Sequence, residues 1–281
     1  MCQVEASIII PTYNKLSRLK LVLKSLEKQI TLSTEVIIVF DGCMPEVVEA
    51  FQKLTFSFKP IQIICSSNIG RACARNRGIL ASKGKIIFFL DDDRLVEKNY
   101  VKTHLEAHHE RCVVLGIRKE IYIVDDQIDN FFENTNQLET YLQGNSYLEN
   151  CFKFNKAPYH PLRWLNFFTG NVSIEREDLI KVGQFDEGFK GWGQEDIDLG
   201  IRLANEKIKF IRCEDAINYH MTHASNYLDK RKDSILNFKY MIKKYKSKFF
   251  VVCILSGLLF KQILVGTQIP KKLKKQYEQY E

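Results

Sequence analysis

Three consecutive carboxylates stand where a short apolar segment of the sequence ends. Asp91, Asp92 and Asp93 directly follow Ile86–Leu90, whose composition is typical of a buried strand. Like charges gathered at the end of a buried strand repel one another unless a cation is bound among them. Carboxylate oxygens are suitable ligands for Mg²⁺ or Mn²⁺, which leave coordination positions open for water and phosphate oxygens. The alternative is a solvated loop in which an Asp caps a helix before Leu95.

A second acidic group follows a glycine-rich loop. Glu195 and Asp196 open a predicted helix directly after the sequence G-W-G-Q at residues 191–194. The two glycines let the backbone approach a ligand closely, and the indole ring offers a face for stacking. The helix dipole favours ionised carboxylates here, and a carboxylate can accept a proton from a hydroxyl or a thiol. The alternative is an ordinary helix start, in which acidic first-turn residues are common.

Two groups of histidines differ in their predicted roles. His220 and His223 follow a strand-like stretch and are candidates for a further metal ligand. Zinc is disfavoured, because no third and fourth ligands with zinc spacing lie nearby in the sequence. The other group lies on the helix predicted after the acidic triplet, and we interpret it as a solvated helix face: His104, His108 and His109.

A basic segment, Asn68–Gly78, is predicted to open a helix. It carries Gly70 followed by three arginines, Arg71, Arg75 and Arg77. An arginine near a helix N-terminus commonly holds the anionic part of a nucleotide. The alternative is a surface helix whose arginines pair with Asp or Glu.

The elements that must position these residues alternate along the first hundred residues. Four short apolar runs are typical of strands buried on both faces, namely Ser7–Ile10, Val36–Phe40, Ile61–Cys65 and Ile86–Leu90. Helix-like stretches separate them at Leu16–Leu26, Pro45–Leu54 and Gly70–Ser82. This order predicts an α/β fold with a mostly parallel sheet and helices on both faces. Such sheets bind ligands at the carboxyl ends of their strands, here Pro11–Asn14, Asp41–Cys43, Ser66–Gly70 and Asp91–Arg94.

The second half of the chain has a weaker pattern. We predict a strand at Phe167–Ile174, a short helix at Arg176–Val182 and an amphipathic helix at Glu195–Ala204. Residues 117–165 show no clean period and are predicted to be irregular, or short helices near the site. Residues 225–281 are predicted to be helical and basic.

Composition excludes several classes of protein. The chain has 281 residues, of which 45% are hydrophobic, with only 6 Pro and 14 Gly, so it is neither disordered nor collagen-like. The net charge is +7, and residues 241–281 account for all of it with nine Lys and two Glu. The neutral remainder has no electrostatic footprint for nucleic acid. Eight scattered cysteines without a C-x-x-C pair, and no signal-peptide pattern, favour a reducing, cytoplasmic compartment.

The basic tail has three interpretations, of which one is that it attracts an acidic acceptor. Its apolar run, Phe249–Phe260, is 12 residues long, whereas a bilayer span needs roughly 20, so a transmembrane helix is not expected. A basic, apolar helix could lie on an anionic membrane, at the inner face of which the protein would then be peripheral. The alternative, which we favour slightly, is a helix that packs its apolar face on the domain and solvates its lysines.

In their order, these motifs resemble an inverting glycosyltransferase of family 2 with the GT-A fold. The resemblance extends over about residues 4–225 and ends in a segment similar to β-1,4-galactosyltransferases. The residues that carry it are Ser7–Asn14, Val39–Cys43, Asn68–Gly78, Asp91–Asp93, Phe168–Ile174, Gly183–Glu187 and Gly191–Leu199. The last two of these segments form one motif; each motif alone is weak, but six in one order are specific.

The resemblance implies a role for each matched residue. Those expected around the nucleotide and its diphosphate are Pro11, Thr12, Tyr13, Asp41, Arg71, Arg75, Asp91 and Asp92. Those expected to hold Mn²⁺ or Mg²⁺ are Asp91 and Asp93, with His223 and His220. Asp196 is implied to be the catalytic base, with Glu195 positioning the acceptor or the sugar. Those expected to line the acceptor and sugar pocket are Gly170, Asn171, Trp192 and Gly193.

Two residues depart from the family pattern. Phe40 stands where the family usually has its first Asp, and Cys43 stands where it usually has Ser. The first departure removes a carboxylate from the expected base pocket, whereas Asp41 is retained.

The resemblance implies transfer of a hexose or N-acetylhexosamine from a UDP-sugar to a glycan, lipid or peptide acceptor. Residues 1–225 would form the catalytic domain, with a nucleotide-sugar half (about 1–116) and an acceptor half (about 117–225), and 226–281 a helical extension. A sugar nucleotidyltransferase is the alternative enzyme, but Pro11–Leu16 lacks the glycine-rich triphosphate loop that it needs. A non-catalytic nucleotide-sugar or glycan binding module is the other alternative.

Overall fold

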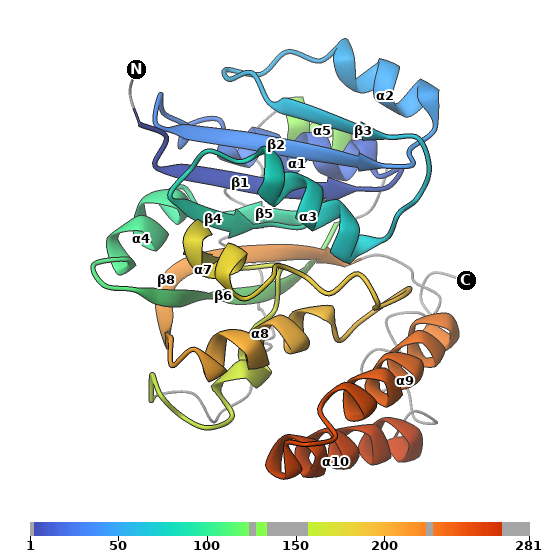
Figure 1. Cartoon of the computed structure of the whole chain (residues 1–281). Coiled ribbons are helices and arrows are strands. Elements are labelled where there is room, and N and C mark those ends of the chain that lie inside the picture. Colours follow the sequence, from blue (N-terminus) through green and yellow to red (C-terminus); the bar gives the residue numbers. More distant parts are fainter. Residues whose placement is uncertain (1–2, 124–127, 134–156, 223–226, 266–281) are drawn as a thin grey trace.

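The computed structural model describes residues 3–123, 128–133, 157–222 and 227–265. The strands are β1 (Ala6–Thr12), β2 (Thr34–Asp41), β3 (Ile61–Cys65), β4 (Ile86–Phe89), β5 (Arg94–Val96), β6 (Cys112–Tyr122), β7 (Val172–Glu175) and β8 (Lys209–Thr222). Within the described part of the chain, these strands form one eight-stranded sheet in the order β3-β2-β1-β4-β7-β6-β8-β5 (Figure 1).

Helices cover both faces of this sheet, and the last two helices pack beside it. They are α1 (Leu16–Leu26), α2 (Pro45–Gln52), α3 (Arg71–Ala81), α4 (Tyr100–Ala107), α5 (Ile128–Glu133), α7 (Arg176–Lys181), α8 (Glu195–Asn205), α9 (Tyr227–Lys244) and α10 (Phe249–Val265), with a 3₁₀ turn η2 (Arg163–Asn166). The predicted α/β fold with a mostly parallel sheet is confirmed: β1, β2, β3 and β4 are mutually parallel. Strand β7 runs antiparallel between β4 and β6.

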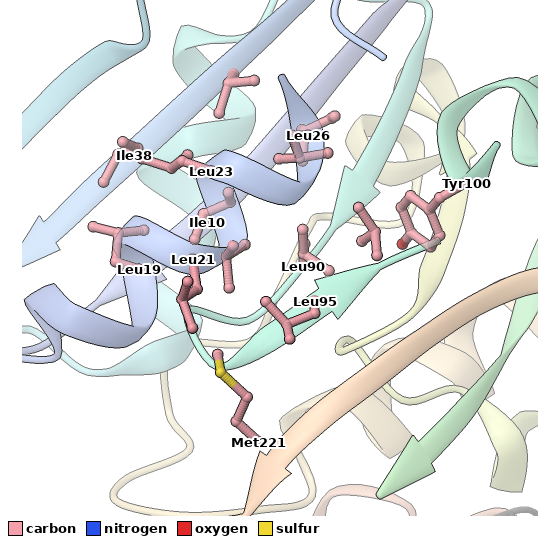
Figure 2. Packing of buried hydrophobic residues seen from close by; sticks show 14 of the residues in the cluster. Ile10, Leu19, Leu21, Leu23, Leu26, Ile38, Leu90, Leu95, Tyr100 and Met221 are labelled. Carbon is pink, nitrogen blue, oxygen red and sulfur yellow. The ribbon is translucent and has the colours of Figure 1, made fainter. Parts of the chain in front are cut away.

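Alternation along β1 explains why its sequence is apolar throughout. Ile10 packs with Leu19 and Leu23 of α1 on one face, as Figure 2 shows. Its neighbour Ile9 points to the other face, where it packs with Ile79 of α3. Because both faces of the central strands are covered, no position is left for the polar half of an alternating pattern.

Two predictions about the middle of the chain were wrong. The strand predicted at Phe167–Ile174 begins only at Val172, because the preceding residues turn, with the N–H of Asn171 donating to the carbonyl of Phe168 (3.2 Å). Residues 117–122, predicted to be irregular, continue β6, which pairs with β8 past a register shift at Gly116/Ile117. Much of the remaining segment lies outside the described residues.

The prediction that three histidines form a solvated helix face was wrong for His104 and His108. His104 is fully buried: its Nδ1 lies 2.8 Å from Ser173 Oγ, and its Nε2 lies 2.9 Å from Asn171 Oδ1. His108 Nε2 contacts the same hydroxyl at 2.8 Å, and only His109 is exposed, as predicted. Burial lowers the pKa of His104 to about 4 and that of His108 to about 3, so both rings are neutral. This cluster ties α4 to β7.

The two C-terminal helices lie side by side (Figure 1), and they pack against η2 and α8. Phe238 of α9 and Leu255 of α10 pack in one cluster with Trp164 and Ile197. Among the described helices, none is both long and apolar enough to cross a bilayer. The packing of Leu255 agrees with the interpretation of a helix docked on the domain, although Phe249 of α10 is 83% exposed.

Candidate active site

The carboxyl ends of the central strands gather polar side chains at one edge of the sheet, as predicted. Thr12 ends β1, and its Oγ1 donates a hydrogen bond to Asp92 Oδ2 (2.8 Å). Lys15, in the turn that follows, places its Nζ 2.8 Å from Asp93 Oδ2 and 3.5 Å from Asp92 Oδ1. This edge therefore brings an ammonium group to the acidic triplet.

The three carboxylates of the triplet have different partners. Asp91 faces Arg75 at 3.0 Å and Arg94 at 3.6 Å, and although burial opposes ionisation these cations hold its pKa below the usual value. Burial, and then the charge of Asp93, raise the pKa of Asp92 to about 6 despite the nearby Lys15. The alternative of a helix-capping loop was wrong, since the chain continues into the strand β5.

Arg75 connects the two acidic groups that the sequence singled out. Its guanidinium is almost fully buried, with Nη2 3.0 Å from Asp91 Oδ1 and Nη1 3.0 Å from Glu195 Oε1. The bridge joins the middle of α3, the end of β4 and the start of α8. Arg75 does pair with Asp and Glu, as the surface-helix alternative held, but it does so inside the protein. Arg71, at the first position of α3, is exposed.

Glu195 and Asp196 occupy different electrostatic environments. Glu195 is 5% exposed and is paired with Arg75. Asp196 Oδ1 accepts a hydrogen bond from the N–H of Ile197 (2.8 Å). Burial, and then the negative charge of Glu195, raise the pKa of Asp196 to about 7. A buried carboxyl whose pKa lies near 7 is typical of sites that move protons near neutral pH.

Of the two candidate histidine ligands, the structure describes His220. Its Nε2 lies 3.7 Å from Asp93 Oδ2, and its Nδ1 lies 2.5 Å from Glu120 Oε2 on the neighbouring strand β6. A carboxylate that holds one ring nitrogen and leaves the other toward an acidic group is the usual surrounding of a metal-binding histidine. Carboxylate oxygens with one imidazole suit Mn²⁺ or Mg²⁺, so these residues fit the predicted ion.

The full metal site stays a prediction. Across the residues that the structure describes, no group of three or more His, Cys, Asp or Glu is already arranged to hold a metal ion. His223 lies outside the described residues. In the present arrangement, Asp91 and Asp93 contact Arg75 and Lys15.

Asp41, a predicted nucleotide contact, holds the loop that precedes α3. Its carboxylate accepts hydrogen bonds from the N–H groups of Ile69 (2.7 Å) and Gly70 (3.1 Å), which fixes the turn before α3. Tyr13 is exposed and Pro11 is half-buried at the same edge. These positions are compatible with the predicted nucleotide contacts, which stay predictions.

The two departures from the family pattern have structural explanations. Phe40 is fully buried, with its ring 5.1 Å from that of Phe51, so its side chain faces the core. Cys43 Sγ receives the N–H of Asn14 (3.3 Å) and lies 3.4 Å from the carbonyl of Thr12. Cys43 thus makes the turn-bracing contacts that a serine hydroxyl could also make.

The residues predicted to line the acceptor pocket fall into two pairs. Asn171 is 1% exposed, and its amide donates to the carbonyls of Ile117 (2.9 Å) and Ala216 (3.0 Å). A Cβ added at Gly170 would overlap with Nε of Arg94. This pair therefore braces the site from within. Trp192 and Gly193 are half-buried in the loop that leads into α8, beside Glu195.

Sequence reasoning missed several residues of the site. They are Lys15, Arg94, Glu120, Lys230, Asp233 and Asn237. Lys15 directly follows the motif that ends β1, so proximity could have suggested it. Glu120 could not be found without the β6–β8 register, which sets it opposite His220.

Family profiles match most of the chain. The family described as "Glycosyl transferase family 2" matches residues 7–179. The family described as "N-terminal domain of galactosyltransferase" matches residues 151–224. The two matches together include every residue of the candidate site up to His223.

Proteins of similar sequence include glycosyltransferases. The chain is 29% identical to the "Uncharacterized glycosyltransferase YfnE" of Bacillus subtilis, over 87% of this chain and 71% of that protein. It is 26% identical to the "Validoxylamine A glucosyltransferase" of Streptomyces hygroscopicus subsp. jinggangensis, over 86% of this chain and 61% of that protein. The chain thus spans only part of the length of these relatives.

Solved structures share the fold. The mannosyltransferase PcManGT from Pyrobaculum calidifontis, in complex with GDP-Man and Mn²⁺, superposes with a TM-score of 0.61 at 14% identity, over 91% of this chain and 69% of that one. TarS 1-349 from S. aureus, in complex with UDP-GlcNAc, superposes with a TM-score of 0.60 at 18% identity, over 83% of this chain and 65% of that one.

Proposed function

The chain belongs to glycosyltransferase family 2, and from this premise we propose that it is an inverting, divalent-metal-dependent hexosyltransferase. The donor is a UDP-sugar carrying a hexose or N-acetylhexosamine, and the acceptor is a glycan, a lipid or a peptide. One observation carries the proposal. The buried Arg75 brings Asp91, at the predicted donor side, together with Glu195, next to the predicted base Asp196.

The two acidic groups have different tasks in the proposed reaction: Asp196 acts on the acceptor, and Asp91 with Asp93 acts on the donor. The Asp196 carboxylate accepts the proton of the acceptor hydroxyl or thiol as that atom forms a bond to the anomeric carbon. The bond between the anomeric carbon and the diphosphate oxygen breaks in the same step, and the nucleoside diphosphate leaves with the electron pair. Attack on the face opposite the leaving group inverts the anomeric configuration. A pKa of about 7 keeps Asp196 basic enough to take a proton, yet largely ionised above neutral pH.

Asp91, Asp93 and His220 are the described residues that would hold the cation, with His223 as the further predicted ligand. A bound divalent ion would supply Lewis-acid stabilisation of the departing diphosphate. Lys15 is already at this edge and neutralises Asp93. Glu120 keeps the ring of His220 oriented.

Thermal unfolding with nucleotides tests the donor. We would measure the midpoint with UDP, GDP and TDP, each with Mn²⁺ and again with EDTA. A ligand at 100 times its dissociation constant stabilises the folded protein by about 2.7 kcal/mol. We expect a shift only for UDP with Mn²⁺. Structures of similar fold were solved with UDP-GlcNAc and with GDP-Man, so a larger shift with GDP would overturn the uridine assignment.

Substitution of the proposed base tests the chemistry. Asp196→Asn keeps the shape of the side chain and removes its basicity. We expect turnover to fall by about 100-fold to 10,000-fold while UDP binding stays within twofold of wild type. Wild-type turnover in the variant would contradict the assignment, and loss of UDP binding would indicate a structural role instead.

We propose that residues 1–225 form the catalytic domain and that 226–281 is a helical extension, in which α9 packs on this domain and α10 contacts an anionic membrane surface. Support comes from α10, whose exposed side carries Phe249, Phe250, Phe260 and Leu264, all more than half exposed. The neighbouring exposed lysines are Lys243, Lys246, Lys248 and Lys261. Each lysine near an anionic bilayer contributes about 1 kcal/mol. The same positive charge disfavours pairing of this face with a second copy of itself.

Vesicle sedimentation tests the membrane contact. We expect binding to vesicles of phosphatidylcholine with phosphatidylglycerol and none to phosphatidylcholine alone. The double variant Phe249→Ser with Phe260→Ser should lose most of this binding. Leu32→Ser is the matched control, because Leu32 is 96% exposed and lies in the loop before β2. Dimerisation without vesicle binding would overturn the proposal.

A further inference from the structure

The loop that leads into α8 has a strained backbone. Gly191 and Gly193 have φ of +65° and +93°, and Gln194, which has a side chain, has φ of +78°. Left-handed backbone is unfavourable for a residue with a Cβ, and such strain persists only where surrounding contacts hold it. Because Glu195 and Asp196 follow directly, whatever holds this loop also sets the position of the acidic pair.

Helix α9 supplies those contacts from one polar face. Asp233 Oδ2 accepts the N–H of Trp192 (3.1 Å), and Ser234 Oγ lies 2.9 Å from Nε2 of Gln194, which donates to it. Asn237 donates through Nδ2 to the carbonyls of Lys190 (2.9 Å) and Gly193 (2.8 Å). Its Oδ1 also accepts the N–H of Lys190 (3.3 Å).

These contacts fit closely and are largely removed from water. Ser234 is 1% exposed and Asn237 is 5% exposed. A Cβ added at Gly191 would overlap with the carboxylate of Asp233, so the glycine is required by the helix as well as by its own φ. Hydrogen bonds shielded from water hold a loop more tightly than exposed ones.

The polar face is separate from the contacts that attach the helix to the domain. Phe238 and Met241 of α9 pack with Trp164 and Ile201, and this apolar cluster accounts for the docking of the helix. The polar residues contact the loop instead. On the same side of the helix, one turn before Asp233, the ammonium group of Lys230 lies 5.8 Å from the centroid of the Trp192 ring.

We propose that α9 is a positioning element of the active site, in which Asp233, Ser234 and Asn237 hold the Gly191–Gln194 loop. The helix thereby fixes the indole of Trp192 on the acceptor side and the approach of Asp196 to the acceptor. This role rests on the proposed transferase function for its effect on turnover. The geometry of the loop itself does not depend on that function.

Substitutions at Asn237 and Asp233 test single contacts between α9 and the loop. Asn237→Asp replaces the amide donor with an acceptor that faces the carbonyl oxygens of Lys190, Trp192 and Gly193, so we expect it to release the loop. Asp233→Asn retains an oxygen that can accept the Trp192 N–H, so we expect near wild-type behaviour, whereas Asp233→Ala should release the loop. Lys239→Ala is the matched control, since Lys239 is an exposed residue of the same helix.

Fluorine NMR on 5-fluorotryptophan protein reports the loop without any activity. The chain has 2 Trp, so two resonances are expected, and Trp192→Phe assigns them. In Asn237→Asp and Asp233→Ala we expect the Trp192 resonance to shift or broaden while that of the buried Trp164 is unchanged. An unchanged Trp192 resonance in Asn237→Asp would overturn the proposal. Equal changes in both resonances would also overturn it, because they indicate general loss of packing.

Kinetics then connect the loop to transfer. We expect kcat/KM for the acceptor to fall by about tenfold to 100-fold in Asn237→Asp, since small misplacements near reacting groups have effects of this size. The midpoint shift given by UDP with Mn²⁺ should stay as in wild type. An altered Trp192 resonance with unchanged acceptor kinetics would overturn the positioning role. Wild-type protein that transfers no sugar would instead contradict the proposed function, and the resonance data would still decide how the loop is held.

Discussion

The two regions of this site, which we propose to be a donor edge and an acceptor side, are built in different ways. At the donor edge, Thr12, Asp41 and Asp91–Asp93 come directly from the ends of adjacent parallel strands. On the acceptor side, a strained loop is held by α9, which lies about forty residues further along the chain. The sheet alone positions the first region, whereas the second depends on contacts between distant segments.

This difference has consequences for where the site is sensitive to mutation. Charges at the donor edge are compensated locally, by Lys15 and Arg94 among others, so a single loss leaves partners in place. Arg75 is the exception, because it spans both regions. If the two regions are otherwise independent, substitution of Arg75 should affect both, whereas substitutions elsewhere should affect one.

Arg75→Met should produce the largest effect. The variant leaves the carboxylate of Glu195 buried without its cation, and breaking a buried ion pair from one side typically destabilises by about 3–5 kcal/mol. We expect the free energy of unfolding in urea to fall by about that amount and transfer to be lost. Arg77→Met, on the exposed side of the same helix, is the control. A loss below about 1 kcal/mol would mean that the two regions do not depend on the bridge.

The fold and the donor edge could be predicted from the sequence because their signals are local. Apolar runs define the buried strands, and the residues that follow them are brought together by the sheet. The buried His104 shows where this reasoning failed: its helix has an ordinary polar pattern, and only the pairing with Ser173 and Asn171 explains the burial. The role of α9 could not be predicted for the same reason, since polar residues on a basic helix carry no sign of their partners.

Glu120→Gln should weaken metal binding with little effect elsewhere. The amide oxygen can still accept the N–H of His220 Nδ1, but it no longer raises the basicity of the nitrogen that faces the metal. Loss of such a supporting carboxylate typically reduces metal affinity by about tenfold to 100-fold. Titration calorimetry with Mn²⁺ measures this directly. Unchanged affinity would show that Glu120 only ties β6 to β8.

The pH dependence of transfer should follow the raised pKa of Asp196. The carboxyl must be ionised to accept the acceptor proton, so kcat/KM should fall about tenfold per unit as pH drops below about 7. The free energy of unfolding should change in the opposite direction and decrease as pH rises. The folded protein holds this proton more tightly than the unfolded chain, so the contribution of Asp196 to folding is lost as pH rises from about 4 to about 7. A flat rate profile between pH 5.5 and 7.5 would exclude Asp196 as the base.

The smallest effect is expected at the donor edge itself, from Cys43→Ser. This change restores the residue that the family usually has, and the hydroxyl can receive the Asn14 N–H and donate to the Thr12 carbonyl as the thiol does. Because Asp41 keeps its hydrogen bonds to Ile69 and Gly70, we expect the unfolding free energy to change by less than about 1 kcal/mol. The preference among UDP, GDP and TDP should also be unchanged. A switch in nucleotide preference would show that the thiol reads the base, and that the donor edge depends on side chains beyond those that the strand ends position.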